Sequence, residues 1–344
     1  MIILTVIVPS YNVEQFIVRC LESLCVKVDE LEVLVIVDGS KDRSAEIAKS
    51  YQEKYPSIFK VIEKENGHYG SCVNVGLSLA SGKYVKILDA DDYFDAQFAE
   101  YLSYLRQVDA DVILSDSISE NFEGYQMGKI AFPLPQNEVL PISVLAHSDV
   151  NIMHHHEVAY RRELLISLQY HQTEGISYTD LEWSTLPFSM ASSVSYCPLT
   201  VYHYLRGRVG QSIDIGYRKN NIWMEDSVVL SLARSYERSK EEIAPENETL
   251  LRTFISSLIR QIYFHYLVNF RGSLNMSELK SFDDDLKGIS ETLYESVNDV
   301  VDIRKFGTFK YIKDYRAGGL INRIRYLYYD SCLAAAKLLK KNGN

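Results

Sequence analysis

Short runs of consecutive apolar residues alternate with segments of helical periodicity over the first third of the chain. The apolar runs are rich in β-branched residues and predict strands at 4–9, 31–37, 59–63, 84–88 and 111–115. The segments between them predict helices at 13–24, 44–55, 71–80 and 97–107. Strands that alternate with helices indicate βαβ units, so we expect an α/β fold with a mostly parallel sheet flanked by helices.

Polar clusters follow four of these predicted strands. They are residues 10–12, 38–40, 66–67 and 89–92. In open α/β sheets, ligands bind beyond the carboxyl ends of the strands. The spacing of the polar clusters therefore predicts a ligand site along that edge.

The pattern changes after residue 215. Long amphipathic stretches at 222–238, 248–270 and 277–297 predict helices, and residues 319–341 predict a basic, tyrosine-rich amphipathic helix. We therefore expect two domains, an α/β domain over 1–215 and a helical domain over 216–344. No run of about 18 apolar residues occurs, so no membrane-spanning helix is expected.

Composition and charge indicate the cellular location and the kinds of binding partner to expect. The 344 residues include five scattered cysteines without metal-like spacing, which favours reduced thiols and a cytoplasmic location. The net charge is −10, but ten Lys and Arg against two Asp give residues 304–344 a charge of +8, which leaves −18 on the rest. An acidic body argues against nucleic-acid binding. The basic tail indicates peripheral contact with the inner face of a membrane. The alternative is a basic helix packed on the acidic body, within one chain or at a subunit contact of a homo-oligomer.

The acidic cluster at 89–92 offers hard oxygen ligands. Neither a Gly-x-Gly-x-x-Gly nor a lysine-containing phosphate loop follows the first predicted strand. Asp89 and Asp91 suit Mn²⁺ or Mg²⁺, and such an ion neutralises a departing diphosphate. Taken alone, the cluster favours an acidic turn that caps the next helix over a metal site.

Four motifs occur together over residues 4–115. They are VIVPSYN at 6–12, VDGSKDRS at 37–44, NG at 66–67 with Gly70, Asn74 and Gly76, and ASGKYVKILDADDYF at 80–94. In order and spacing they resemble the inverting family 2 glycosyltransferases, which have the GT-A fold. Two positions depart from the family pattern: Val37, where Asp or Asn is usual, and Val73, where an arginine is common.

The resemblance implies roles for individual residues. Pro9 and Tyr11 would lie against the nucleotide base, and Asp38 would accept a hydrogen bond from its edge. Asn66, Gly70, Asn74 and Ala90 would line the nucleotide pocket. Asp89 would face the ribose or sugar and, with Asp91, hold the metal.

An inverting transfer needs a general base to take the acceptor proton. Residues 178–183 (YTDLEW) correspond to the segment where relatives often carry an acidic pair. Asp180 takes the position of the base, and Thr179 replaces the commoner Glu. Glu182 and Trp183 would lie beside the acceptor or the donor sugar. The alternative is a capping box, in which Thr179 or Asp180 begins a helix and Glu182 completes the cap.

The segment 202–212 (YHYLRGRVGQS) predicts a mobile loop. Arginine forks match phosphate oxygens. Similar loops in related bacterial enzymes close over the donor diphosphate, and the resemblance implies that Arg206, Arg208, Gln211 and Ser212 do so here. The alternative is an exposed turn with solvated arginines. His203 is a less certain neighbour of the metal.

Three adjacent histidines, 154–156, lack the i, i+4 spacing of a helical metal site. We expect His155 and His156 to line the acceptor side and pack in the core, and we expect no zinc site.

The sequence thus predicts an inverting, metal-dependent transfer of a sugar from a nucleotide-sugar, with a UDP-sugar expected, to a glycan or lipid-linked acceptor in bacterial surface-polysaccharide assembly. Two alternatives stay open: a nucleotidyltransferase, and a non-catalytic sugar-nucleotide-binding scaffold.

Overall fold

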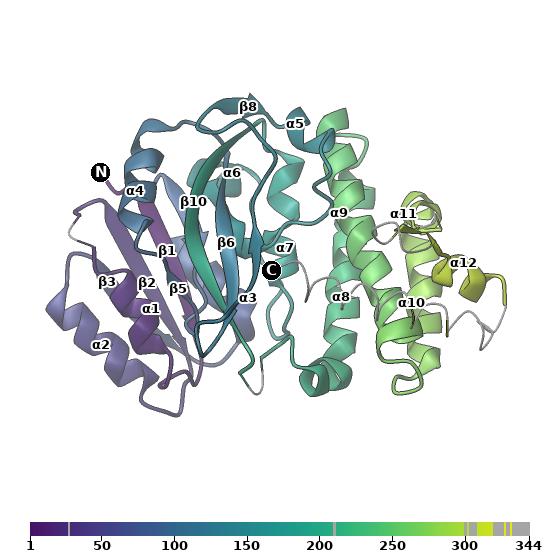
Figure 1. Cartoon of the computed structure of the whole chain (residues 1–344), viewed down its shortest axis with the longest axis horizontal. Helices are drawn as coiled ribbons and strands as arrows, with labels where there is room; N and C mark the ends of the chain where they lie inside the picture. Colours follow the sequence, from purple (N-terminus) through teal and green to yellow (C-terminus); the bar gives the residue numbers. More distant parts are fainter. Residues whose placement is uncertain are drawn as a thin grey trace. The chain divides into compact units, whose positions relative to one another are not determined.

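A computed structural model describes residues 1–26, 28–208, 211–298, 301–302, 308–318, 327 and 331. The chain forms two compact units (Figure 1). The first contains residues 1–218 and 242–251, and the second contains the described parts of 219–241 and 252–344. The chain therefore leaves the first unit and returns to it before it enters the second again.

The first unit is built on one mixed sheet. Its strands lie in the order β3-β2-β1-β4-β9-β6-β10-β5, with β7 beside β6 and β8 beside β10. Their bounds are β1 Leu4–Ser10, β2 Leu31–Asp38, β3 Phe59–Lys64, β4 Tyr84–Ile87, β5 Tyr93–Phe94, β6 Val112–Asn121, β7 Gln126–Ile130, β8 Val139–Pro141, β9 Val158–Arg161 and β10 Ser193–Arg206. Strands β1 to β4 pair in parallel, whereas β9 pairs antiparallel with both β4 and β6.

Helices connect and flank these strands, which confirms the α/β class. They are α1 Ile17–Ser23, α2 Ser44–Lys54, α3 His68–Leu79, α4 Phe98–Gln107, α5 Ser143–Ala146, α6 Arg162–Ser167 and α7 Asp180–Trp183, with the short 3-10 helices η1 His155–Glu157 and η2 Leu186–Ser189.

Several predicted bounds were wrong. The helix predicted from residue 13 begins at Ile17, and the strand predicted over 111–115 continues to Asn121. The first part of the predicted loop 202–212 belongs to β10, which ends at Arg206. Strand β10 was missed because it pairs with neighbours on both sides, and such pairing overrides a local sequence that mixes aromatic and polar residues.

The core of the first unit explains the continuous apolar runs. β1 and β2 are covered on both faces, so nearly all their residues are buried. Gly76 lets α3 approach β1, because a Cβ atom there would stand 2.6 Å from Ile7 Cγ2. The close approach fixes α3 over the sheet and positions the loops at both of its ends.

The second unit is mainly helical, as expected. Its elements, some of which begin in the first unit, are α8 Ile215–Ser239, α9 Pro245–Phe264, the π-helix η3 His265–Asn269, α10 Met276–Ile289, α11 Glu291–Ser296, β11 Val301–Asp302, β12 Thr308–Phe309 and α12 Tyr311–Arg316. Within the described residues, no helix has the length and apolar character needed to span a bilayer. The amphipathic helix predicted for 319–341 lies outside the residues that the structure describes, apart from single positions.

Candidate active site

The carboxyl ends of the parallel strands bring the polar clusters to one edge of the sheet. Asp38 ends β2 and Lys64 ends β3, and the two residues pair directly in the register of the strands. Asp38 Oδ1 accepts hydrogen bonds from Lys64 Nζ at 2.6 Å and from the backbone N–H of Gly67 at 2.9 Å. Asp38 is 2% exposed, so these partners hold its carboxylate in place.

The predicted nucleotide-pocket residues 66, 70 and 74 hold loops together in this structure. Asn66 Nδ2 donates to the carbonyl of Asp38. Asn74 exchanges two hydrogen bonds with the backbone of Gln172, its Oδ1 accepting at 2.8 Å and its Nδ2 donating at 2.9 Å. A Cβ atom on Gly70 would stand 2.0 Å from the carbonyl oxygen of Thr173. Gly70 and Asn74 therefore fix the segment around residue 173 against α3.

Other predicted contacts of the nucleotide lie at the surface or beneath it. Tyr11 is 51% exposed and Pro9 is half-buried at the end of β1. Ala90 is buried within the acidic turn. Exposure leaves the ring of Tyr11 open to a flat ligand, whereas the Ala90 side chain offers little surface to one.

Asp92 anchors the acidic turn to β10. Its carboxylate accepts hydrogen bonds from Tyr202 Oη and from the backbone N–H of Leu205, both at 2.7 Å. Tyr202 Oη in turn accepts from the backbone N–H of Asp89 at 3.1 Å. Burial and the nearby Asp91 raise the pKa of Asp92 well above its usual range. Asp92 therefore holds the turn that carries Asp89 and Asp91.

Asp91 faces the predicted diphosphate-binding loop. Its Oδ2 atom lies 2.9 Å from both Nε and Nη2 of Arg208, and Gln211 Nε2 donates to it at 3.3 Å. Gln211 also donates to the carbonyl of Leu205 and accepts from the backbone of Arg208. Arg206 and Ser212 are exposed. Of the four loop candidates, Arg208 and Gln211 are thus the two that contact the acidic turn.

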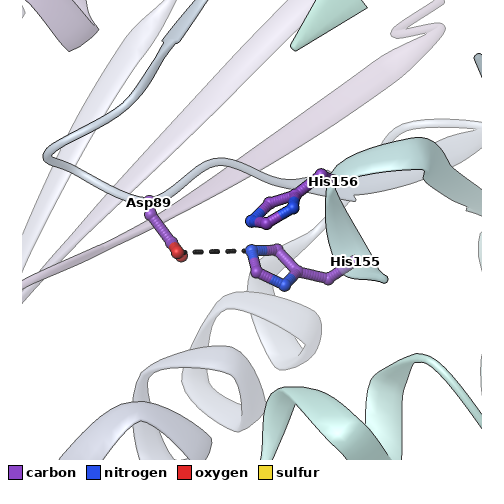
Figure 2. Close-up of side chains that lie close together, drawn as sticks. All are labelled: Asp89, His155 and His156. Carbon is purple, nitrogen blue, oxygen red and sulfur yellow. Dashed lines mark ion pairs between the residues drawn. The ribbon is translucent and has the colours of Figure 1, made fainter. Parts of the chain in front are cut away.

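Asp89 meets His155, which lies on η1 (Figure 2). Its Oδ2 atom is 3.2 Å from His155 Nε2, and its Oδ1 atom accepts a hydrogen bond from Tyr69 Oη at 3.0 Å. His155 Nδ1 lies 3.7 Å from Asp180 Oδ2. Burial disfavours the imidazolium, but the carboxylates of Asp89 and Asp180 outweigh burial and raise the pKa of His155 to about 10. His155 therefore links the acidic turn to the candidate base.

Asp180 opens α7 with its side chain 37% exposed. The alternative of a capping box is not supported, because no side chain caps α7. The preceding Tyr178 has φ +68°, a conformation uncommon for a bulky residue, and its hydroxyl donates to the carbonyl of Ser212. Strained residues that surrounding contacts hold in place are frequent at functional sites.

Glu182 and Trp183 are not placed to meet a sugar, and the expectation for both was wrong in this structure. Glu182 is 3% exposed and accepts hydrogen bonds from the backbone N–H and the hydroxyl of Thr173, both at 2.7 Å. Trp183 is fully buried and packs edge-on against Tyr160 and Tyr170. On a four-residue helix, the side facing the sheet is core, and these two residues belong to it.

His156 packs as expected, but it is largely shielded from solvent. Its ring stacks on Tyr204 and contacts Tyr202, and the residue is 9% exposed. Burial and the neighbouring His155 hold the pKa of His156 well below its ordinary value. His203 lies elsewhere, with its ring nitrogens 2.9 Å from Tyr93 Oη and Asp95 Oδ2.

Two groups of side chains in the described part of the chain have the donor atoms for a cation. Asp89, Asp91 and Asp92 form one group, and Asp89, His155 and His156 form the other, with the donor atoms of each group within 4.8 Å of one another. Carboxylate oxygens and imidazole nitrogens are ligands for divalent metals, and an ion bound at the second group would displace the proton that the carboxylates hold on His155. The residues present therefore fit a divalent ion centred near Asp89.

Tyr69 and Gln172 were missed from the sequence. Tyr69 supports Asp89, and Gln172 Nε2 donates to the carbonyl of Thr179 at 2.6 Å, next to Asp180. No local pattern distinguishes either residue from ordinary packing or loop residues. Their roles follow from contacts between distant segments.

Comparison with known proteins finds similarity over the first half of the chain. Residues 5–168 match the family described as Glycosyl transferase family 2. An uncharacterized glycosyltransferase of Bacillus subtilis, EpsJ, is 30% identical over 172 residues. The match covers 47% of this chain and 48% of EpsJ, so the chain matches about half the length of that relative.

Solved structures share the fold more widely. S. aureus TarS superposes with a TM-score of 0.60 over 86% of this chain and 50% of TarS, at 19% identity. Its residues 1–349, in complex with UDP-GlcNAc, give a TM-score of 0.52 at 18% identity over 88% of this chain and 95% of that one. The mannosyltransferase PcManGT from Pyrobaculum calidifontis, in complex with GDP-Man and Mn²⁺, gives 0.51 at 17% identity, over 98% of this chain and 86% of PcManGT. At these identities the likeness shows the fold, and it confirms the expected GT-A architecture.

Proposed function

We propose that this chain, whose residues 5–168 match glycosyl transferase family 2, transfers a sugar from a nucleotide-sugar to a hydroxyl group, with inversion at the anomeric carbon. The observation that carries the proposal is the position of Asp180. Its partly exposed carboxylate lies across His155 from Asp89, in a site whose remaining carboxylates are buried or paired.

Asp180 acts as the general base. It takes the proton of the acceptor hydroxyl as that oxygen forms a bond to the anomeric carbon. The bond between the anomeric carbon and the diphosphate oxygen breaks at the same time, and the nucleoside diphosphate leaves with the electron pair. Holding acceptor and donor in line accounts for a large part of the rate enhancement.

The other residues bind and orient the donor. The exposed ring of Tyr11, with Pro9, offers a face for the base, and Arg208 offers a guanidinium to the diphosphate. Asp89 and Asp91 have the donor atoms for Mn²⁺ or Mg²⁺, which when bound neutralises charge on the leaving diphosphate. Asp92 and Tyr202 keep the acidic turn in position.

We propose a UDP-sugar as the donor and a glycan or a lipid-linked glycan as the acceptor, in assembly of a bacterial surface polysaccharide. The complex of TarS with UDP-GlcNAc supports the choice of nucleotide. A Bacillus subtilis relative named minor teichoic acid biosynthesis protein GgaB, 36% identical over 91 residues, supports the setting. The proposed site of action is the inner face of the membrane, which the basic composition of residues 304–344 favours.

The proposal is tested first by donor binding. We expect one of the UDP forms of glucose, galactose, N-acetylglucosamine or N-acetylgalactosamine to raise the melting temperature in the presence of Mn²⁺, because a ligand that binds only the folded state stabilises it. Absence of a shift with every nucleotide-sugar, with and without metal, would contradict the proposal.

The second test is Asp180→Asn. We expect the variant to bind the donor as the wild type does and to lose transfer by a factor of about 10²–10⁴, the usual contribution of a general base. Glu163→Gln, an exposed change on α6, is the matched control and should retain full activity. Equal transfer by Asp180→Asn and the control would remove Asp180 from the role of base.

A further inference from the structure

A mixed group of nitrogen and oxygen donors lies at the centre of the candidate site. Asp89 comes from the turn after β4, and His155 and His156 come from η1. One donor atom from each residue lies within 4.8 Å of the others. Figure 2 shows the ring of His155 directed at the carboxylate of Asp89, with the ring of His156 beside it.

His155 has a buried side chain whose ring nitrogens make no hydrogen bond. It is 4% exposed, and neither Nδ1 nor Nε2 has a hydrogen-bonding partner. The 3.2 Å approach of Nε2 to Asp89 is therefore a contact between charged groups without the alignment of a hydrogen bond. A buried polar atom left in this way is costly unless something else satisfies it.

His203, another buried histidine of the first unit, lacks this property. Its two ring nitrogens hydrogen-bond at 2.9 Å with Tyr93 Oη and Asp95 Oδ2. His155 thus combines burial, unsatisfied nitrogens and an adjacent carboxylate.

The neighbouring acidic residues are already engaged. Asp91 Oδ2 contacts Arg208 and Gln211, and both oxygens of Asp92 accept hydrogen bonds from β10. Asp89 keeps Oδ2 directed at His155, with the carboxylate of Asp180 on the far side of the ring. Two carboxylates, those of Asp89 and Asp180, thus lie beside the two nitrogens of one ring, and they attract a cation at this point.

We propose that Asp89, His155 and His156 form a mixed nitrogen–oxygen site for a transition-metal ion, with Mn²⁺ as the probe that fits it. Imidazole nitrogen favours Mn²⁺ and the later first-row ions over Mg²⁺, which prefers oxygen ligands alone. The inference deepens the proposed function and rests on it for its catalytic meaning. Metal binding itself is independent of any donor or acceptor.

Pulsed electron paramagnetic resonance of Mn²⁺ bound to the full chain, without nucleotide, tests the site. We expect modulation from a directly bound imidazole ¹⁴N nucleus in the wild type. A spectrum without nitrogen coupling, or no bound Mn²⁺ at all, would overturn the inference whatever the variants show.

His155→Gln assigns the nitrogen. We expect its Mn²⁺ dissociation constant to rise by about 10–100-fold, because removing even a residue that only supports a metal ligand has an effect of that size. The Mg²⁺ dissociation constant should change little. The depth of the nitrogen modulation should fall in parallel. Circular dichroism establishes that the variant is folded.

His203→Gln is the matched control, since His203 is a second buried histidine beside carboxylates. It should leave the affinity and the nitrogen modulation unchanged. If His203→Gln removed the nitrogen signal while a folded His155→Gln retained it, the site would have been assigned to the wrong residue.

Different results would refute the proposed function and the proposed metal site. Sugar transfer with a nitrogen-free Mn²⁺ spectrum leaves the proposed function standing and refutes the mixed site. Nitrogen coupling to bound Mn²⁺ that weakens in His155→Gln, with no transfer or donor binding for any nucleotide-sugar, supports the site and refutes the function.

Discussion

Replacing Asp226 with asparagine should stabilise the second unit, and more strongly at higher pH. Asp226 on α8 is 8% exposed, and one of its oxygens, Oδ1, is buried without a hydrogen-bond partner. Its other oxygen accepts a hydrogen bond from Tyr266 Oη at 2.8 Å. Burial, together with the nearby Glu225 and Glu278, raises the pKa of Asp226 from 3.8 to about 7 against the effect of the Tyr266 hydrogen bond.

The sign follows from proton linkage. Because the folded state holds this proton more tightly than the unfolded state, stability is lost as pH rises from the unfolded pKa near 3.8 through the folded value of about 7. With those two values, the loss between pH 6 and pH 8 is about 1.4 kcal/mol. Asparagine keeps the shape of the protonated acid and carries no charge, so the variant escapes this loss.

Urea unfolding of wild type and variant at pH 6 and pH 8 measures the effect. Both values lie above the isoelectric point of about 5.4 and avoid precipitation near it. We expect the stability advantage of Asp226→Asn over the wild type to grow by about 1.4 kcal/mol between the two pH values.

Asp284→Asn on α10 is the matched control, because Asp284 is exposed and should show no such growth. An advantage for Asp226→Asn that is equal at both pH values, or that shrinks as pH rises, would refute the linkage argument.

Two further predictions concern the candidate site. Arg208→Ala should raise the KM for the donor by about 10–100-fold, which is the fold-change that corresponds to one hydrogen bond to a charged group. Arg206→Ala is the control and should change the KM less, because Arg206 is exposed and does not contact Asp91. Initial rates over a range of donor concentrations measure both, and a wild-type KM in Arg208→Ala would remove Arg208 from the donor site. Gly70→Ala should lower the free energy of unfolding by about 1–3 kcal/mol, because the added Cβ would overlap the carbonyl of Thr173. Gly288→Ala is the control and should be neutral or stabilising, because a Cβ added there would have no heavy atom within 4 Å. Thermal melting compares the two, and equal melting temperatures would show that the segment around Thr173 shifts at no cost.

The parallel half of the sheet was predictable because local sequence and tertiary position agree there. The runs at 4–9 and 31–37 are continuous and apolar, as strands covered on both faces must be, and they became β1 and β2. Asp38 and Asp89 follow strands that run in one direction, so their place at one edge of the sheet follows from topology.

Roles that depend on distant partners were not predictable in the same way. Asn74 and Gly70 were assigned to a nucleotide pocket, whereas the structure shows them holding residues 172 and 173 about a hundred positions further along the chain. Trp183 was assigned to a sugar because its type suits one, but it is fully buried and packs edge-on against Tyr160 and Tyr170. Residue type indicates what a side chain is able to bind, and only the fold determines whether it is accessible.

The adjacent histidines show that the spacing of residues in the sequence does not by itself decide whether they form a metal site. Successive residues point in different directions on a helix or strand, and that argued against a metal site in 154–156. On the short 3-10 helix η1, the rings of His155 and His156 instead lie 4.0 Å apart between centroids, and Asp89 approaches from another segment. A donor group assembled from two segments leaves no regular spacing in the sequence. The ring of His155 lies between Asp89 and Asp180, so it would contact both a cation bound at Asp89 and the proton-accepting carboxylate of Asp180. Replacing His155 should therefore affect metal affinity and sugar transfer together.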